Sequence, residues 1–304
     1  MDHPLLSNEF SAYRKRMVQL LQSAYSVRRG SNFLFVCGGN EENHLRPRFN
    51  RFCAEQGIEY EIFYPEFAMP AYFAGPIDEP FDIADFEILL GDLSHAIIVF
   101  PEAPGSFAET GYFSAISLLS EKTILVLDAN RQQEDSFISL GPAKKIAGCS
   151  VFQPAIQLDY GDPKFEHVLQ RVARVGIGRT KKALSIEGFS DLTSYELFCL
   201  VQRVVDLMTV ATIADVTYVL RALFRSRLSL PTVKKIIAIM VGAKYLAWAG
   251  DYGHLTVTPN KVSLLDVKEG YREQESTLRL ELAAAYQQRD QEFLSILELA
   301  RNVD

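Results

Sequence analysis

The chain has 304 residues, a formal net charge of −7, and a composition that is 48% hydrophobic and 23% charged. This length exceeds the usual size of one domain, so we expect two. No apolar stretch is long enough to span a bilayer, and the N-terminus lacks the basic and apolar regions of a signal peptide. We therefore expect a cytoplasmic protein with no membrane partner.

The four cysteines lie far apart in the chain, at Cys37, Cys53, Cys149 and Cys199. They form no Cys-x-x-Cys pair, and the histidines are not clustered. This pattern is typical of reduced core thiols rather than of disulfides or a zinc site. We expect no metal and no resident cofactor.

Strands and helices alternate in the first half. The hydrophobic pattern predicts helices over residues 10–29, 46–56, 85–93 and 105–119, strands over 32–37, 59–64, 95–100 and 122–127, and a loop over 65–80. Continuous apolar strands between helices predict an α/β fold, a doubly wound parallel sheet covered on both faces. In such sheets, ligands bind beyond the carboxyl ends of the strands. Four loops lie at that edge, at Gly38-Gly39, Tyr64 to Glu66, Pro101 to Ser106, and Asp128.

The second half is mostly helical. Gly176 to Lys182 resembles a linker, so we place one domain at 1–175 and a second at 176–304. Predicted helices over 191–208, 212–226 and 229–242 precede a hairpin over 245–258, and the chain ends in a helix over 270–300. Helices followed by a hairpin are the order of a winged helix-turn-helix, so we predict a winged-helix-like domain.

A basic stripe runs through this second domain. Residues 216–250 contain no acid, and the candidate contacts with nucleic acid or a protein partner are Arg221, Arg225, Arg227, Lys234 and Lys235. Such a stripe can meet phosphates even though the whole chain is acidic. The alternative is a solvated helix face, and the sequence leaves both open.

Glu109 is the candidate catalytic residue. It lies about one turn into the helix that follows the third strand, where Gly105 and Ser106 begin that helix and its unpaired N–H groups can bind an anion or polar ligand. A carboxylate at this edge can attack an anomeric carbon. Ser106 and Glu109 also have the spacing of a capping box, in which both serve only to cap the helix. Spacing by itself does not decide between the two.

The segment Pro104 to Gly111 resembles the nucleophile segment of the nucleoside 2-deoxyribosyltransferase family. The chain resembles more closely the retron-associated effector toxins, which are built on that fold. Shared blocks occur in the same order at Phe33 to Gly39, Phe63 to Glu66, Phe100 to Gly111 and Ser136 to Pro142. Members of that family work with a reverse transcriptase and its branched RNA–DNA product (msDNA) as anti-phage toxin systems, and at least one branch consumes NAD⁺.

The resemblance implies roles for single residues. Glu109 takes the position of the nucleophile, and Glu87 that of the acid which binds sugar or base. The residues implied to line the pocket are Gly38, Gly39, Tyr64 and Glu66. For Tyr64 core packing is an equal alternative, and for Glu66 a solvated loop position.

One departure from the deoxyribosyltransferase pattern bears on the substrate. Those enzymes carry an aspartate five or six residues before the nucleophile, which protonates the departing purine. Here Pro104 and Ala103 occupy these positions, and neither can donate a proton. Nicotinamide leaves NAD⁺ neutral without protonation, so the pattern favours NAD⁺ as substrate. A loop shift could bring Glu102 in as the acid.

The sequence hypothesis is therefore an N-glycosidase effector that cleaves NAD⁺ and is held inactive by reverse transcriptase and msDNA. A homo-oligomer or a higher assembly is expected, since related folds often complete their sites across subunit contacts. Two alternatives stay open: a nucleotide-sensing nucleic-acid-binding regulator, and a deoxyribosyltransferase that exchanges bases. A cytokinin-activating phosphoribohydrolase ranks lower because two phosphate-binding glycines of its loop are absent.

Overall fold

The computed structural model describes residues 3–73, 82–132, 135–177, 182–184, 192–224, 228–251, 253–259, 261–288 and 291–303. The chain divides into two compact units. Unit 1 comprises residues 1–29, 66–81 and 179–304, and unit 2 comprises residues 30–65 and 82–178. They differ from the contiguous domains 1–175 and 176–304 predicted above, because two early segments group with the later part of the chain.

Unit 2 is a parallel sheet between helices. Its strands are β2 (Phe33–Cys37), β3 (Glu61–Phe63), β4 (Ala96–Val99), β5 (Thr123–Asp128) and β6 (Ile156–Leu158), in the order β3-β2-β4-β5-β6. Its helices are α2 (Leu45–Gln56), α4 (Ile83–Leu93), α5 (Pro104–Ala115), α6 (Ser117–Ser120), the π-helix η2 (Ser139–Ala143), α7 (Lys144–Cys149) and α8 (Glu166–Val175). The predicted doubly wound α/β fold is confirmed.

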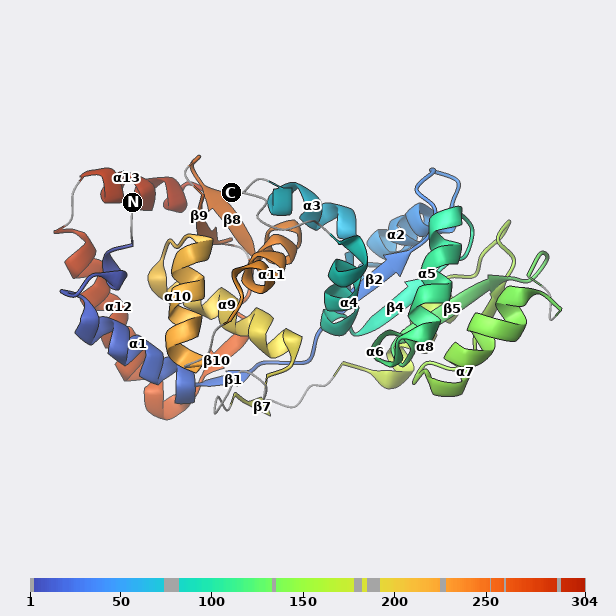
Figure 1. Ribbon diagram of the computed structural model, residues 1–304, viewed down its shortest axis with the longest axis horizontal. Coiled ribbons are helices and arrows are strands. Elements are labelled where there is room, and N and C mark those ends of the chain that lie inside the picture. Colours follow the sequence, from blue (N-terminus) through green and yellow to red (C-terminus); the bar gives the residue numbers. More distant parts are fainter. Residues whose placement is uncertain are drawn as a thin grey trace. The chain divides into compact units, whose positions relative to one another are not determined.

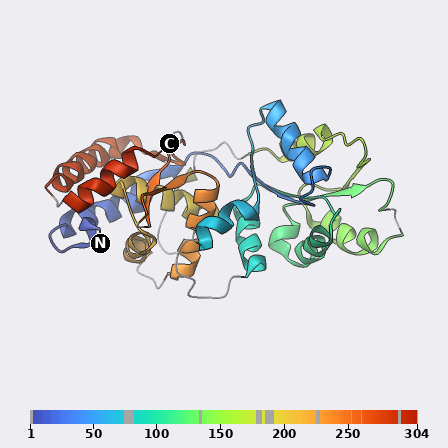
Figure 2. The same ribbon diagram turned by 90° about the horizontal axis from the view of Figure 1, so that it is seen from above.

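Alternation along the strands determines which side chains face which helices. On β2, Leu34 and Val36 pack into one cluster with residues of α2 and α8. Phe35 lies on the opposite face, where its ring centroid is 5.9 Å from that of Phe113 on α5. Figure 2 shows α2 and α8 on one face of the sheet and α5 and α7 on the other. Cys37 shares a face with Phe35 and therefore points towards the α4–α5 layer.

Unit 1 is mostly helical (Figure 1). Its elements are η1 (Pro4–Leu6), α1 (Ser11–Ser23), β1 (Tyr25–Val27), most of α3 (Pro65–Phe73), β7 (Lys182–Ala183), α9 (Ser194–Met208), α10 (Ile213–Phe224), α11 (Leu230–Gly242), β8 (Leu246–Ala249), β9 (His254–Val257), β10 (Leu265–Val267), η4 (Glu269–Tyr271), α12 (Arg272–Tyr286) and α13 (Gln291–Arg301). Strand pairing explains why the first residues belong here, because β1 pairs antiparallel with both β10 and β7.

A buried charge network ties β1 to the later helices of unit 1. The Tyr25 hydroxyl donates to Glu275, and the Arg203 guanidinium lies 4.9 Å from the centroid of the Tyr25 ring. Arg203 also donates to Glu275 at 3.3 Å and to Asp206 at 3.0 Å. Buried carboxylates persist when they are paired in this way. The network gives residues 1–29 a physical reason to pack with α9 and α12.

Four predicted elements differ in extent. The helix expected over 10–29 ends at Ser23, because Tyr25 to Val27 finds strand partners. The loop expected over 65–80 begins instead with α3, in which a proline is accommodated. The helix expected over 105–119 begins at Pro104 and breaks at Ile116 into α5 and α6. The single helix expected over 270–300 consists of α12 and α13.

The predicted helix and hairpin order is present in unit 1. Helices α10 and α11 pack together, and the β8–β9 hairpin follows them. Ala211, between α9 and α10, forms an antiparallel bridge with Leu255 of that hairpin.

All four cysteines are free thiols, as expected, although Cys149 is exposed rather than in a core. Within the described ranges, no helix is both long and apolar enough to cross a membrane. The same residues contain no group of His, Cys, Asp and Glu side chains suited to a metal ion.

His3 is a buried titratable group in the core of unit 1. Its Nδ1 accepts from the Leu5 amide at 3.1 Å, and its ring packs edge-on against Tyr286 and Phe293. Burial lowers the pKa of His3 to about 4, against a partly opposing effect of the Asp215 charge. The folded protein therefore holds His3 neutral at pH values where the unfolded chain protonates it.

This difference predicts a loss of stability in acid. Between about pH 6.5 and pH 4 the unfolded state binds a proton that folded His3 does not, so the free energy of unfolding falls, by about 3 kcal/mol if His3 acts alone. Urea unfolding at a series of pH values measures this. His3→Gln should flatten the pH dependence, whereas His167→Gln, at an exposed position of α8, should retain it. Equal pH dependence in both variants would contradict the assignment.

Candidate active site at the carboxyl edge of the parallel sheet

The strand order creates a switch point between β2 and β4. The chain leaves β2 towards α2 on one face and leaves β4 towards α5 on the other. Loops that diverge in this way open a crevice at the carboxyl ends of the strands, where doubly wound folds bind ligands. The loop Gly38-Gly39 and the loop from Phe100 to Ala103 flank this point.

Glu109 does not cap its helix. Helix α5 begins at Pro104, and Ala103 is its N-cap. The Ser106 hydroxyl accepts from the Glu102 and Ala103 amides, at 3.1 and 3.0 Å, and donates to the Ala103 carbonyl. Ser106 is therefore the third helical residue, and Glu109 lies a turn further along, beyond the first-turn amides. The capping-box interpretation of Glu109 is wrong, and the buried Ser106 has a structural role.

The Glu109 carboxylate meets the end of β2. The Cys37 thiol hydrogen-bonds to Glu109, and the Oε2 atom of Glu109 is buried. Burial raises the pKa of the Cys37 thiol well above its usual range, and the charges of Glu109 and Glu87 raise it further. Glu87, on α4, is itself buried at 7% exposure. The structure thus brings Glu109 and Glu87 around Cys37.

Tyr112 extends this group along α5. It lies three residues after Glu109, on the same side of the helix. Burial, followed by the charges of Asp85, Asp82 and Glu87, raises the pKa of the Tyr112 hydroxyl. The first turns of α4 therefore present carboxylates to the same region as α5. An acidic wall of this kind stabilises positive charge, such as that on a sugar ring losing its base.

Glu102 is held by backbone amides. Its carboxylate accepts from the Leu45 amide at 2.7 Å, from the Gly39 amide at 3.1 Å and from the Arg46 amide at 3.3 Å. These contacts satisfy the N-terminus of α2, where a carboxylate is favoured by the helix dipole. Glu102 thus serves the fold in this conformation.

The two glycines before α2 are explained by packing. A Cβ at Gly38 would meet the Arg46 Cβ at 2.9 Å, and a Cβ at Gly39 would meet the His44 ring at 2.1 Å. At Gly105 an added Cβ would meet nothing within 4 Å, so the first turn of α5 is open. Its φ is not left-handed, so neither the backbone conformation nor the packing at this position requires glycine.

The remaining predicted pocket residues, Tyr64 and Glu66, belong to other parts of the fold. Tyr64 follows β3 and packs in the hydrophobic cluster between the sheet and helices α2 and α8, with the Arg46 guanidinium 4.8 Å from its ring centroid. This is the core-packing alternative. Glu66 is exposed in the first turn of α3 and belongs to the segment that groups with unit 1.

The predicted basic stripe is partly engaged within unit 1. The Arg221 Nε donates to the Leu228 carbonyl at 2.9 Å, and the Lys234 ammonium lies 4.7 Å from the centroid of the Tyr72 ring. Lys235 is half-buried on α11. Arg225 and Arg227 lie outside the described residues.

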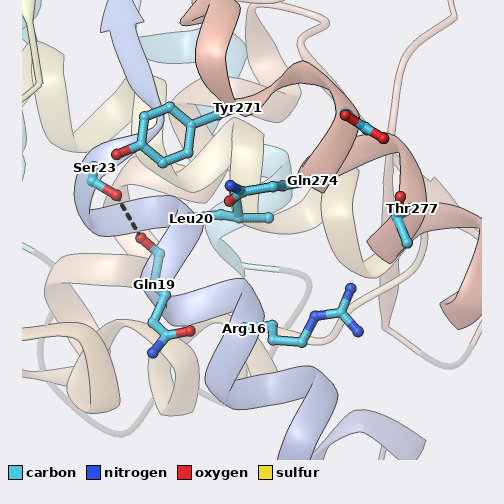
Figure 3. A pocket seen from close by; sticks show the side chains of 8 residues that line it. Arg16, Gln19, Leu20, Ser23, Tyr271, Gln274 and Thr277 are labelled. Carbon is cyan, nitrogen blue, oxygen red and sulfur yellow. Dashed lines mark hydrogen bonds between the residues drawn. The ribbon is translucent and has the colours of Figure 1, made fainter.

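Unit 1 also contains two hollows. One, of about 360 Å³, lies between α1 and the η4–α12 segment and is lined by polar side chains that include Arg16, Gln19 and Gln274 (Figure 3). The other, of about 710 Å³, is lined by Arg28, Arg203 and Arg272 together with Asp266 and Glu275. Arg28 and Arg203 are paired with these two acids, at 2.9 and 3.3 Å, so part of the positive charge is neutralised.

A family model of retron effector proteins, described as "STM3845 retron effector protein", matches residues 42–247, well over half of the chain. The chain belongs to this retron effector family. Two proteins of Escherichia coli are similar to this effector, and both are named provisionally as ribosyltransferase/DNA-binding proteins. That of retron Ec86 is 36% identical over 121 residues, and that of retron Ec73 is 29% identical over 118 residues. Each match covers 38% of this chain, and 38% and 37% of the two relatives.

Sequence reasoning does not identify three residues of the candidate site, namely Cys37, Arg46 and Tyr112. Cys37 was interpreted only as a core thiol, although its position at the end of an apolar strand directly before two glycines was a usable signal. Tyr112 could have been found from its spacing of three residues after Glu109. Nothing local pointed to Arg46, whose positive charge partly offsets the rise in the pKa of the Cys37 thiol, because only the folding of the chain brings α2 close to the end of β2.

The Glu102 geometry predicts a stability effect. Glu102→Gln removes the charge from the bonds to the α2 amides and should lower the free energy of unfolding by about 1–2 kcal/mol. Denaturant unfolding at neutral pH measures it. Glu55→Gln, at an exposed position of the same helix, should change it by less than about 0.5 kcal/mol. Equal effects of the two substitutions would mean that the amide contacts contribute nothing.

Proposed function

We propose that this retron effector is an N-glycosidase that cleaves the sugar–base bond of a nucleotide, with Glu109 as nucleophile. The observation that carries the proposal is the convergence of Glu109 and Glu87 on Cys37 beside the switch point. The capping role that competed for Glu109 is filled by Ser106. The provisional naming of the two relatives as ribosyltransferases is in line with the same chemistry.

The proposed reaction has two displacements. A carboxylate oxygen of Glu109 forms a bond to the anomeric carbon while the bond to the base breaks, and the base leaves with the electron pair. Water then attacks the same carbon and releases Glu109, with one proton passing to solvent. Positive charge develops on the sugar in both transition states, and the carboxylate of Glu87 stabilises it. A second nucleobase in place of water would make the enzyme a transferase.

NAD⁺ is the substrate that we favour. Ala103 and Pro104 offer no proton to a departing base, and Glu102 is held by three backbone amides. Nicotinamide departs neutral without protonation, whereas a neutral purine leaves poorly without an acid. NAD⁺ is then a substrate rather than a cofactor.

The nucleophile assignment predicts that Glu109→Gln lowers base release by about 10³-fold or more, since the amide cannot form the glycosyl ester. The measurement is chromatography of free base from NAD⁺, 2′-deoxyadenosine and AMP incubated with the purified chain. Glu121→Gln, an exposed position after α6, is the matched control and should keep full activity.

The outcomes separate the alternatives. Release of adenine from deoxyadenosine with no loss of NAD⁺ would support the deoxyribosyltransferase alternative. Base release that survives Glu109→Gln would overturn the nucleophile. A chain that binds these nucleotides but releases no base would favour the nucleotide-sensing regulator.

We further propose that unit 1 contacts the retron's nucleic acid and reverse transcriptase, which hold the effector inactive in a cytoplasmic complex. The order of α10, α11 and the β8–β9 hairpin, with the Ala211 bridge, supports a winged-helix-like domain. Lys234 and Lys235 on α11 then lie where such a domain meets phosphates. The naming of both relatives as DNA-binding points the same way.

A paired charge reversal tests this role. Lys234→Glu with Lys235→Glu should weaken binding to msDNA at least tenfold and make the slope of log K against log salt shallower by about 1–2. Fluorescence anisotropy over a range of NaCl concentrations measures both. Lys144→Glu with Lys145→Glu, an exposed pair on α7 of unit 2, carries the same charge change. If the two pairs weaken binding equally, the stripe has no specific role.

A further inference from the structure

Cys37 is placed by the backbone of a central strand. It is the last residue of β2, in register with Val99 of β4, and its carbonyl accepts a hydrogen bond from the Phe100 amide at 3.0 Å. Its side chain is buried at 2% exposure, on the sheet face that packs against α4 and α5. The thiol hydrogen-bonds to the Glu109 carboxylate. The Cys37 thiol, fixed in the sheet, therefore donates to the carboxylate of Glu109, which lies on helix α5.

The thiol is unsuited to be a nucleophile itself. Nucleophilic attack by cysteine requires the thiolate. Burial, and then the charges of Glu109 and Glu87, raise the pKa of the Cys37 thiol against a smaller opposing effect of the Arg46 charge, so it stays protonated at neutral pH. A protonated thiol is a weak hydrogen-bond donor. Such a thiol can orient a carboxylate while it withdraws only little electron density from the carboxylate oxygens.

Glu102 shows the contrasting case within the same unit. Its carboxylate is held by three backbone amides at the start of α2, an arrangement that stabilises negative charge and fixes both oxygens. A carboxylate bound in that way is a poor nucleophile. The S–H donor at Glu109 is weaker than a backbone N–H and withdraws less charge from the carboxylate.

We infer that Cys37 is a positioning residue for the nucleophile: its thiol donates to one oxygen of Glu109 and aims the other at the anomeric carbon. This inference rests on the proposed function, because it assigns Cys37 a role through Glu109. Cys37 acts through Glu109 and forms no bond to the substrate.

The test compares two buried cysteines of unit 2. Cys37→Ala removes the donor, and Cys53→Ala, on α2, removes an equally buried thiol whose pKa is raised by burial with no charged partner. The assay is base release from NAD⁺ and from 2′-deoxyadenosine by the purified full chain. Cys37→Ala should lower kcat about tenfold with little change in KM, since a hydrogen bond to a charged group is lost but no substrate contact.

Two further readouts separate positioning from packing. A donor to the carboxylate favours its ionised form, so the acidic limb of the pH–rate profile should move to higher pH in Cys37→Ala and stay in place in Cys53→Ala. Cys37→Ser restores a donor and should recover most of the lost kcat. Equal kinetics and pH profiles in the two alanine variants would overturn the inference, even if Glu109→Gln abolishes turnover.

Infrared spectroscopy gives a readout without turnover. The S–H stretching band that disappears in Cys37→Ala should shift to higher wavenumber in Glu109→Gln, because an amide oxygen is a weaker acceptor than a carboxylate. The band assigned through Cys53→Ala should not move. An unshifted Cys37 band would overturn the contact itself. Loss of the proposed function alone would instead appear as base release that is insensitive to Glu109→Gln.

Discussion

The carboxylate of Glu102 joins the two loops on which the candidate site depends. Glu102 lies in the loop after β4. Its carboxylate accepts hydrogen bonds from the amides of Gly39, Leu45 and Arg46, which follow β2. These two strands border the switch point, where the chain departs to opposite faces of the sheet. Without the Glu102 carboxylate, the amides in the first turn of α2 would lose their hydrogen-bond acceptor. The contact also explains why Gly38 and Gly39 have no side chains, since α2 packs directly against them.

With these loops joined, α5 can begin immediately after β4. Pro104 starts the helix, and Ser106 satisfies the amides before it. Glu109 therefore does not cap the helix. Its carboxylate accepts a hydrogen bond from Cys37 at the end of β2, and the charge of Glu87 on α4 acts on the same thiol. Neighbouring glutamates of one segment thus have different tasks. Glu102 supports the scaffold, and Glu109 lies among groups that can direct its reactivity.

Unit 1 is held together by different interactions. Its first strand is fixed by antiparallel pairing and by the buried network of Tyr25, Arg203 and Glu275. Each carboxylate in that network is paired, as burial demands. This retron effector therefore combines a parallel-sheet unit that carries the candidate chemistry with a mostly helical unit assembled from residues 1–29, 66–81 and 179–304. The basic residues of α10 and α11 belong to unit 1, where two of them already make internal contacts.

The sequence by itself determined the parallel sheet, because its strands are continuous apolar runs between amphipathic helices, and it singled out Glu109 and Glu87. It could not decide whether Glu109 caps a helix, since the Ser-x-x-Glu spacing is compatible both with a capping box and with a catalytic carboxylate. It also misassigned residues 24–29 and 65–73, whose strand and helix depend on partners far along the chain. The meeting of Cys37 with Glu109 was decided by tertiary structure alone. Residues 72 positions apart come together there only because β2 and β4 pair and α5 folds back across them.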